Sequence, residues 1–173
     1  MDDKRNVLDE FKGKLHENIV QELNERGVTL EIAIENLERD YNMGTIVRNA
    51  NAFGVRKVHV IGSRQWNKRG AMMTDKYLEI IYHSSVTEFI KNTNNKELVA
   101  IDNVVGSTNL NTTTLKKDTI MILGSEGAGI SNELLGYCKK IIAIEQFGST
   151  RSVNVGVAAG IVMYEWLRRH RLT

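Results

Sequence analysis

The chain has 173 residues, of which 42% are hydrophobic and 25% charged, and its formal net charge is +2. This composition is typical of a folded globular protein and excludes a disordered one. No apolar run reaches the roughly 18–20 residues that cross a bilayer. The acidic start MDDKRNVLDEF also lacks the apolar core of a signal peptide. We therefore expect a cytoplasmic protein with no membrane partner.

The cysteine and histidine content gives little support for a metal site or a disulfide. Cys138 is the single cysteine, so an intrachain disulfide framework is excluded. The four histidines show no paired spacing that suits metal binding or catalysis, and we interpret them as structural; they are His16, His59, His83 and His170. The sequence predicts no metal site.

The first segment, residues 7–23, has apolar residues four apart and predicts an amphipathic helix that Gly27 ends. After it, short apolar strands alternate with helices. We expect strands at 30–34, 57–61, 79–82, 97–101, 119–123 and 140–144. We expect helices at 43–53, 68–76, 84–92, 131–137 and 153–169, with Ser84 and Ser152 as N-caps.

This alternation predicts an α/β protein with a mainly parallel sheet flanked by helices. No repeat or low-complexity linker divides the sequence. We expect one domain over residues 1–173, with residues 1–27 as an N-terminal helical extension.

Three polar loops attract attention because ligands of such sheets bind beyond the carboxyl ends of the strands. The first is NMGTIVRNANAFG, Asn42 to Gly54. The second is ILGSEGAGIS, Ile122 to Ser131. The third is the start of IEQFGSTRSVNVGVAAGIVMYEW, Ile144 to Trp166.

The second loop contains three glycines, Gly124, Gly127 and Gly129, which allow backbone amides to approach a ligand. It lacks the Lys-Ser/Thr end of a phosphate-binding P-loop and the spacing of a dinucleotide fingerprint. Glu126 would also repel a phosphate. The loop therefore favours a neutral or cationic nucleoside-like ligand, although a tight turn alone would use the same glycines.

Single residues in the other loops have two interpretations each. Ser152 is a good helix N-cap and Asn154 falls in the first helical turn, where each can hold a ligand or simply cap the helix. Arg48 lies in a helix of small and apolar residues, so it is either a phosphate clamp or a surface ion pair.

Two basic clusters are also present. Arg64, Lys68 and Arg69 flank Trp66, and three arginines, Arg168, Arg169 and Arg171, stand near the end of the sequence. Such clusters contact phosphates in nucleic-acid-binding proteins. Taken alone, they are more often a solvated surface and a frayed helix end.

Together, the three loops resemble the three ordered motifs of the SpoU-type (TrmH-like) RNA ribose methyltransferases in the SPOUT superfamily. The first resembles Asn-x-Gly-x-Ile-x-Arg-x-Ala, the second Gly-x-Glu-x-x-Gly, and the third Ser-Leu-Asn-Val followed by an alanine-rich helix. The resemblance spans residues 30–167. The sequence departs from the usual pattern at Glu145, where proline is common, at Val153 for leucine and at Gly156 for serine.

The resemblance implies a dimeric enzyme that transfers a methyl group from S-adenosyl-L-methionine (AdoMet) to a ribose 2′-hydroxyl in RNA. It also implies a deep trefoil knot in the C-terminal part of the fold. The implied cofactor-binding residues are Leu123, Gly124, Gly129, Ile144, Ser152 and Val153. The implied catalytic residues are Arg48 at the centre, with Asn42, Glu126, Ser152 and Asn154 supporting it.

For Arg48 the resemblance suggests a general base. A guanidinium rarely releases its proton, so a second role is open, in which Arg48 holds a neighbouring RNA phosphate and aligns the ribose. We favour alignment. Glu126 is expected to orient a loop or a side chain of the partner subunit. The N-terminal helix and the Arg64–Arg69 stretch are candidate RNA contacts.

Among RNA substrates, transfer RNA is favoured over ribosomal RNA. The QFG…RS portion, Gln146 to Ser152, is similar to enzymes that methylate a D-loop guanosine. Ribosomal RNA stays open as the alternative. So does a noncatalytic RNA-binding relative, although the intact motif residues argue against it. A nucleotide-dependent oxidoreductase is disfavoured because the dinucleotide fingerprint is missing.

Overall fold

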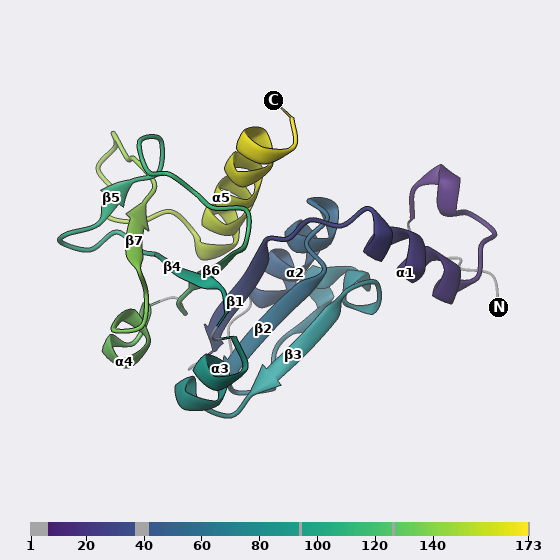
Figure 1. The fold of residues 1–173 in the computed structure, drawn as a ribbon, viewed down its shortest axis with the longest axis horizontal. Helices are drawn as coiled ribbons and strands as arrows, with labels where there is room; N and C mark the ends of the chain where they lie inside the picture. Colours follow the sequence, from purple (N-terminus) through teal and green to yellow (C-terminus); the bar gives the residue numbers. More distant parts are fainter. Residues whose placement is uncertain (1–6, 37–41, 94, 126, 173) are drawn as a thin grey trace.

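A seven-stranded sheet forms the centre of the described part of the chain, and all its strand pairs are parallel. The computed structural model describes residues 7–36, 42–93, 95–125 and 127–172. In spatial order the strands are β3 (Glu79–His83), β2 (Lys57–Gly62), β1 (Glu31–Asn36), β6 (Thr119–Leu123), β4 (Glu97–Ile101), β7 (Lys140–Ala143) and β5 (Thr108–Asn109) (Figure 1). The mainly parallel sheet predicted from the sequence is confirmed.

Helices cover both faces of this sheet. The helices of the described residues are α1 (His16–Glu25), α2 (Asn42–Ala52), α3 (Val86–Thr93), α4 (Asn132–Leu135) and α5 (Val155–His170), with 3-10 turns η1 (Asp9–Phe11), η2 (Lys68–Ala71) and η3 (Thr74–Lys76). Helices α2 and α5 pack through Val47 and Ala159 into the larger core cluster on one face. Helices α3 and α4 pack through Phe89 and Leu134 on the other. Every residue of the central strand β6 is buried because both faces are covered.

The contact between α2 and α5 is close because α5 carries glycines where the helices meet. A Cβ on Gly156 would lie 2.9 Å from Thr45 Cγ2, and one on Gly160 would lie 3.2 Å from Asn49 Nδ2. Asn49 Nδ2 also donates to the carbonyl of Gly156 at 3.1 Å. The first motif is therefore fixed against the start of α5.

At the N-terminal side, η1 and α1 form a small separate cluster. Phe11, Ile19 and Tyr77 are buried together there. Figure 1 shows α1 at the opposite end of the molecule from β5. The single-domain organisation with a helical extension over residues 1–27 stays a prediction. None of the helices within the described ranges is long and apolar enough to cross a membrane.

Both predicted N-caps are displaced toward the C-terminus. The cap of α3 is made by Ser85, whose Oγ accepts from Glu88 N at 3.2 Å, while Ser84 donates to the Glu88 carboxylate. The cap of α5 is Asn154, whose Oδ1 accepts from two backbone amides of the first turn. Ser152 lies before the helix, outside regular secondary structure. In each case the side-chain oxygen of the cap residue accepts hydrogen bonds from backbone amides two or three residues later in the chain.

The predicted helix at 68–76 was also wrong. Two 3-10 turns, η2 and η3, are separated by Met72 and Met73, whose φ angles of 49° and 65° are left-handed. A left-handed pair cannot continue a right-handed helix. The sequence analysis also missed the two-residue strand β5, which lies in a polar Thr/Asn-rich segment.

A buried polar row crosses β1, β2 and β3. His59 Nε2 lies 2.9 Å from Glu31 Oε2, and His59 Nδ1 lies 2.9 Å from His83 Nε2. Burial raises the pKa of Glu31, but hydrogen bonds from His59 and Lys96 outweigh it and leave the pKa below its ordinary value. Both ring nitrogens of His59 on β2 are thus paired, one with β1 and one with β3. These histidines therefore connect three neighbouring strands.

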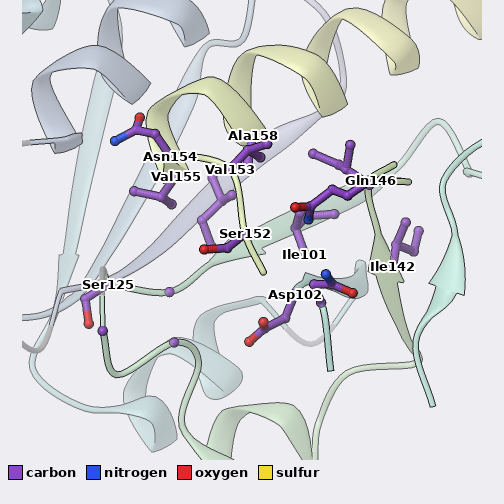
Figure 2. Close-up of a pocket in the computed structure, with 16 residues that line it drawn as sticks. Ile101, Asp102, Ser125, Ile142, Gln146, Ser152, Val153, Asn154, Val155 and Ala158 are labelled. Atoms are coloured by element: carbon purple, nitrogen blue, oxygen red, sulfur yellow. The ribbon is translucent and has the colours of Figure 1, made fainter. Parts of the chain in front are cut away.

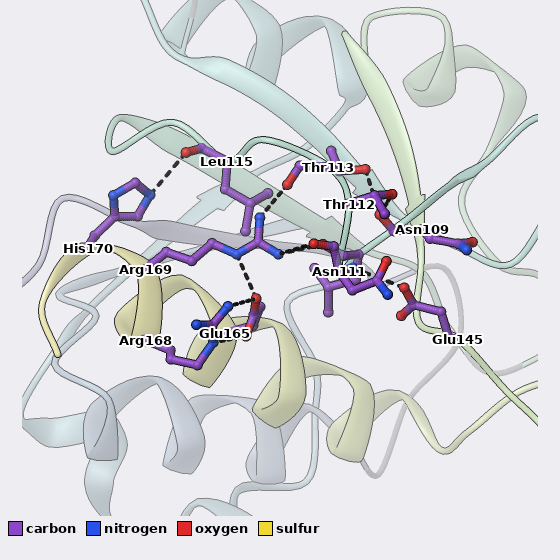
Figure 3. A network of polar contacts seen from close by, with 11 residues as sticks. Asn109, Asn111, Thr112, Thr113, Leu115, Glu145, Glu165, Arg168, Arg169 and His170 are labelled. Carbon is purple, nitrogen blue, oxygen red and sulfur yellow. Dashed lines mark hydrogen bonds and ion pairs between the residues drawn. The ribbon is translucent and has the colours of Figure 1, made fainter. Parts of the chain in front are cut away.

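The segment that carries β5 is held by the last turns of α5 (Figure 3). The guanidinium of Arg169 donates to the carbonyl of Leu110 at 2.6 Å and also to that of Thr113. His170 Nε2 lies 3.0 Å from the carbonyl of Leu115. These pairs are 55 to 59 residues apart in the sequence. The trefoil knot itself stays a prediction.

Candidate active site

A cavity of about 650 Å³ opens at the carboxyl ends of β4, β6 and β7. Its lining comes from four segments, which lie within 101–103, 123–129, 142–146 and 152–158 (Figure 2). Small-molecule pockets measure roughly 300–1,000 Å³, so the cavity can hold a nucleoside-sized ligand. Its place is the one expected for a ligand in a parallel α/β sheet.

The glycine-rich turn after β6 forms one wall. A Cβ on Gly124 would lie 2.1 Å from the carbonyl carbon of Gly129, so only glycine fits there. Gly127 and Gly129 have φ angles of +92° and +67°, and Gly129 N donates to Ser125 O at 3.0 Å. The hydrogen bond between Gly129 and Ser125 closes the turn. Glu126, predicted to be catalytic, lies outside the described residues.

The segment that follows β7 forms the facing wall. Asn103 Nδ2 donates to the carbonyl of Arg151 at 2.9 Å, and Glu145 Oε1 accepts from Asn111 N at 3.0 Å (Figure 3). Glu145 stands where the resembled motif commonly has proline. It fastens this segment to the neighbouring loop through a hydrogen bond, so the missing rigidity of proline is replaced by a tertiary contact.

Asn154 joins two of the three motifs. Its Oδ1 caps α5 by accepting from Gly156 N at 3.0 Å and Val157 N at 3.2 Å. Its Nδ2 donates to Asn42 Oδ1 at 2.9 Å, at the first residue of α2. One side chain thus lines the cavity, caps α5 and binds the start of the helix that carries Arg48.

The structure brings most of the predicted site residues together. All six residues that the resemblance assigned to the cofactor line the cavity: Leu123, Gly124, Gly129, Ile144, Ser152 and Val153. Of the predicted catalytic residues, Ser152 and Asn154 line it and Asn42 is bonded to Asn154. Arg48 is exposed on α2, one turn after Thr45, and is not among the lining residues.

Four polar residues of the cavity had no assigned role in the sequence analysis. Asp102 and Asn103 directly follow β4, and Ser125 and Gln146 follow β6 and β7. Figure 2 shows the carboxylate of Asp102 and the hydroxyl of Ser152 on two sides of the hollow. Inspection of the carboxyl end of every predicted strand would have found Asp102 and Asn103, because they directly follow the apolar residues 98–101.

Two buried oxygens in the cavity lining, Ser125 Oγ and Gln146 Oε1, have no hydrogen-bond partner among the residues that the structure describes. Buried polar atoms are normally paired, so these two suit a ligand with hydrogen-bonding groups. Together with the carboxylate of Asp102, they fit a polar ligand that carries positive charge. These three oxygen-bearing groups fit AdoMet, which combines a nucleoside with a positively charged sulfonium.

Other reactive groups are poorly suited to catalysis. Burial raises the pKa of the Cys138 thiol to about 11, so the thiol stays protonated at neutral pH. Within the described ranges, no group of three His, Cys, Asp or Glu side chains is arranged to hold a metal ion.

The fold and cavity define a parallel α/β protein with a nucleoside-sized pocket at the carboxyl edge of its sheet. A family model described as the SpoU rRNA Methylase family matches residues 29–164. The chain belongs to this family, and the family resemblance inferred from the three motifs is confirmed.

Individual relatives are similar over most of the chain. The tRNA (guanosine(18)-2′-O)-methyltransferase of Escherichia coli (strain K12) is 26% identical over 161 residues, which are 88% of this chain and 69% of that protein. The 23S rRNA (guanosine-2′-O-)-methyltransferase RlmB of Pseudomonas aeruginosa is 29% identical over 162 residues, 88% of this chain and 65% of that protein.

Solved structures share the fold. The crystal structure of the A. aeolicus TrmH/SpoU tRNA modifying enzyme matches with a TM-score of 0.79 and 26% identity, over 91% of this chain and 85% of that one. The SpoU methyltransferase AviRb from Streptomyces viridochromogenes, solved in complex with AdoMet, matches with a TM-score of 0.73 and 24% identity, over 83% and 58%.

Proposed function

We propose that this protein methylates a ribose 2′-hydroxyl of RNA and uses AdoMet as the methyl donor. The observation that carries the proposal is the hydrogen bond from Asn154 Nδ2 to Asn42 Oδ1. It connects the nucleoside-sized cavity to the helix of Arg48 in a chain of the SpoU family. Relatives named as tRNA and rRNA 2′-O-methyltransferases support the same reaction class.

The cofactor would be held by the glycine turn after β6 and by the extended residues before α5. Gly124, Ile144 and Val153 would offer backbone groups, while the Asp102 carboxylate would attract a cation. AdoMet supplies a methyl group that is already activated on a sulfonium. The remaining task of the protein is positioning, since holding reactants in line removes much of the barrier.

Arg48 would act on the RNA rather than on the cofactor. Its side chain is exposed on α2 and does not line the cavity, so it is free to meet a large substrate. A guanidinium presents a planar fork that matches a phosphate. We assign Arg48 to a phosphate next to the modified ribose. Asn42, Ser152 and Asn154 would fix the relative position of this helix and the cofactor wall, and Glu126 would orient a neighbouring loop.

The test is single-turnover methyl transfer to RNA by wild type, Arg48→Lys and Lys91→Arg across a range of pH. Lys91 is an exposed cation on α3 and serves as the matched control, since it undergoes the reverse exchange of the same two residue types. We expect Arg48→Lys to lose at least about tenfold in rate, because lysine cannot make the forked contact, and Lys91→Arg to keep it. Full-rate transfer by Arg48→Lys would refute this role for Arg48.

Transfer RNA is the substrate we favour, with a D-loop guanosine as the target, and ribosomal RNA is the second candidate. The similarity of residues 146–152 to the D-loop enzymes supports the first choice, while relatives of both kinds are similar to this chain. Mapping of 2′-O-methyl sites in total RNA with and without the protein decides between them. Transfer of labelled methyl to neither RNA would favour a noncatalytic RNA-binding relative.

We also propose that the protein acts as a homodimer in the cytoplasm. An apolar stripe on α5 supports the dimer, since Val157, Ile161 and Tyr164 are 52%, 38% and 52% exposed and lie on one helix face. The RNA site would then draw on both protomers.

A further inference from the structure

A second candidate surface lies beside the proposed active site, in the segment that follows β2. Arg64, Lys68 and Arg69 are exposed there, and Trp66 is half-buried among them. Trp66 packs against the edge of the main core together with Tyr82 of β3. We call Arg64, Trp66, Lys68, Arg69 and Tyr82 the basic-aromatic platform.

The backbone of this platform is ordered by its own side chains. Ser63 Oγ accepts from Gln65 N at 3.2 Å, and Asn67 Oδ1 accepts from Arg69 N at 3.0 Å. The second bond caps η2. Such local caps fix loops that contain no regular helix or strand. The cations and rings are therefore presented in a defined arrangement before any partner binds.

Within the platform a cationic side chain lies over each aromatic ring. The guanidinium carbon of Arg64 lies 5.5 Å from the ring centre of Tyr82, and Lys68 Nζ lies 5.6 Å from that of Trp66. Trp66 Nε1 donates to the hydroxyl of Tyr82 at 3.2 Å. Lys68 Nζ forms an ion pair with Asp75 Oδ2 at 3.5 Å. Hydrogen bonds from Ser84 lower the pKa of Glu88, and the positive charge of Arg64 adds a smaller effect in the same direction.

The platform is coupled directly to the helix of Arg48. A Cβ on Gly44 of α2 would lie 2.7 Å from Ala71 N, and one on Gly70 would lie 3.3 Å from Gly44. This backbone contact leaves no room for side chains between α2 and η2. The two exposed residues that follow η2, Met72 and Met73, have left-handed backbone angles, which non-glycine residues rarely adopt.

The platform also shares an edge of the sheet with the cavity. It follows the carboxyl end of β2, and the cavity lies at the carboxyl ends of β6 and β4. In the strand order β2 is separated from β6 by β1 alone. At about 4.8 Å between neighbouring strands, the end of β2 is roughly 10 Å from the end of β6 and roughly 14 Å from that of β4. A nucleotide near the one in the active site can reach the platform.

We propose that the basic-aromatic platform binds an unpaired nucleotide of the substrate RNA, with its base stacked on Trp66 and its phosphates held by Arg64 and Arg69. This inference rests on the proposed function. Unpaired bases expose faces that stack on aromatic rings, while bases within a duplex do not. The platform therefore selects RNA whose target lies in a loop.

The first test uses Trp66 as a fluorescent reporter. The chain has two tryptophans, and Trp166 is only 3% exposed with Nε1 bonded to Lys116 O at 3.0 Å. Unfractionated transfer RNA is expected to quench wild-type emission, and Trp66→Phe should remove this change. A fully paired RNA duplex with the same number of phosphates should quench little. Equal quenching by duplex and transfer RNA would overturn the proposal.

The second test compares transfer RNA affinity and its salt dependence across variants. Trp66→Ala should weaken binding about 5- to 150-fold, and Trp66→Phe should restore most of it, because stacking is worth about that factor per base. Arg69→Gln should reduce the slope of log K against log salt by about 0.7, the value for one phosphate of a single strand. Lys91→Gln, on α3 across the sheet, is the matched control and should change neither.

Separate measurements distinguish this inference from the proposed function. AdoMet binding by calorimetry and methyl transfer by wild type report on the active site, and the platform variants should keep wild-type AdoMet affinity. A wild type that methylates RNA while Trp66→Ala and Arg69→Gln bind RNA normally overturns the platform alone. If Trp66→Ala fails to fold, Arg69→Gln and the quenching result still decide. A wild type that binds RNA through the platform but transfers no methyl refutes the proposed function alone.

Discussion

At the scale of single residues, Asn154 shows how one side chain can serve three purposes. An asparagine amide carries both an acceptor and donors. Here the acceptor caps α5 and a donor binds Asn42. A serine or threonine at the same place would satisfy the helix but would be too short to reach α2. The residue type therefore reflects the contact between motifs as well as the cap.

Two substitutions separate these roles. Asn154→Ser keeps a capping oxygen and loses the link to Asn42, while Asn154→Ala loses both. We expect Asn154→Ala to lower the free energy of unfolding by about 1 kcal/mol and Asn154→Ser to change it little. Both should slow methyl transfer about 2- to 12-fold, the value of one net hydrogen bond. Urea denaturation and single-turnover rates check this. A fully active Asn154→Ser would show that the link is dispensable.

At the scale of elements, the glycine turn after β6 is closed by contacts between the backbones of its described residues. Gly124 touches the backbone of Gly129 across the turn, and Glu35 Oε2 accepts from Ser131 N at 2.7 Å just beyond it. A turn closed by its own backbone contacts presents its amides without a further loss of entropy on binding. The turn is thus suited to hold a cofactor through main-chain groups.

Gly124→Ala tests this turn. The new methyl group meets the carbonyl carbon of Gly129 at 2.1 Å, so the turn must open. We expect AdoMet affinity to fall more than about tenfold in calorimetry. Gly148→Ala is the matched control because a Cβ there meets nothing within 4 Å. Equal AdoMet affinity for the two variants would argue against a cofactor in this cavity, and thermal melting separates loss of binding from loss of fold.

Elements differ in how well the sequence predicted them. The buried strands were predicted because they contain short apolar runs such as residues 120–123. Strand β5 is polar and two residues long, and it exists because β7 pairs with it, so no local pattern indicates it. Met72 and Met73 interrupt a helical pattern because η2 must pack on Gly44, a tertiary requirement.

The candidate site was predicted in the same uneven way. Glycines and polar residues at strand ends located the cavity wall, and all six proposed cofactor residues line it. Asp102 was missed because no motif includes it. The position of Arg48 outside the lining follows from the angle between α2 and the cavity, which depends on how Thr45 packs on Gly156. Spacing along one helix carries no information about such an angle.

At the scale of the whole molecule, the outer face of α5 is unusually apolar. Val157, Ile161 and Tyr164 are exposed next to Phe53, whose ring centre is 6.1 Å from that of Tyr164. Exposed apolar residues that cluster on one face mark interaction sites more often than scattered ones do. Because Phe53 directly follows α2, this exposed face adjoins the C-terminal end of the helix that carries Arg48.

A charge on this face should separate the subunits. We expect wild type to sediment as a dimer and Ile161→Glu as a monomer, because a carboxylate buried in an apolar interface without a partner is strongly unfavourable. Val105→Glu is the matched control, since Val105 is fully exposed in a loop. Sedimentation equilibrium measures the outcome. A monomeric wild type would contradict the proposed homodimer.

The bonds from Arg169 and His170 to the β5 segment have a consequence for biosynthesis. Leu115 leaves the ribosome 55 residues before His170, its hydrogen-bond partner. At about 5–20 residues per second, the nascent chain waits roughly 3–11 s before those carbonyls can be satisfied. The residues that line the cavity end at Ala158, so the β5 segment acquires its hydrogen-bond partners on α5 only after the residues of the cavity wall have been made.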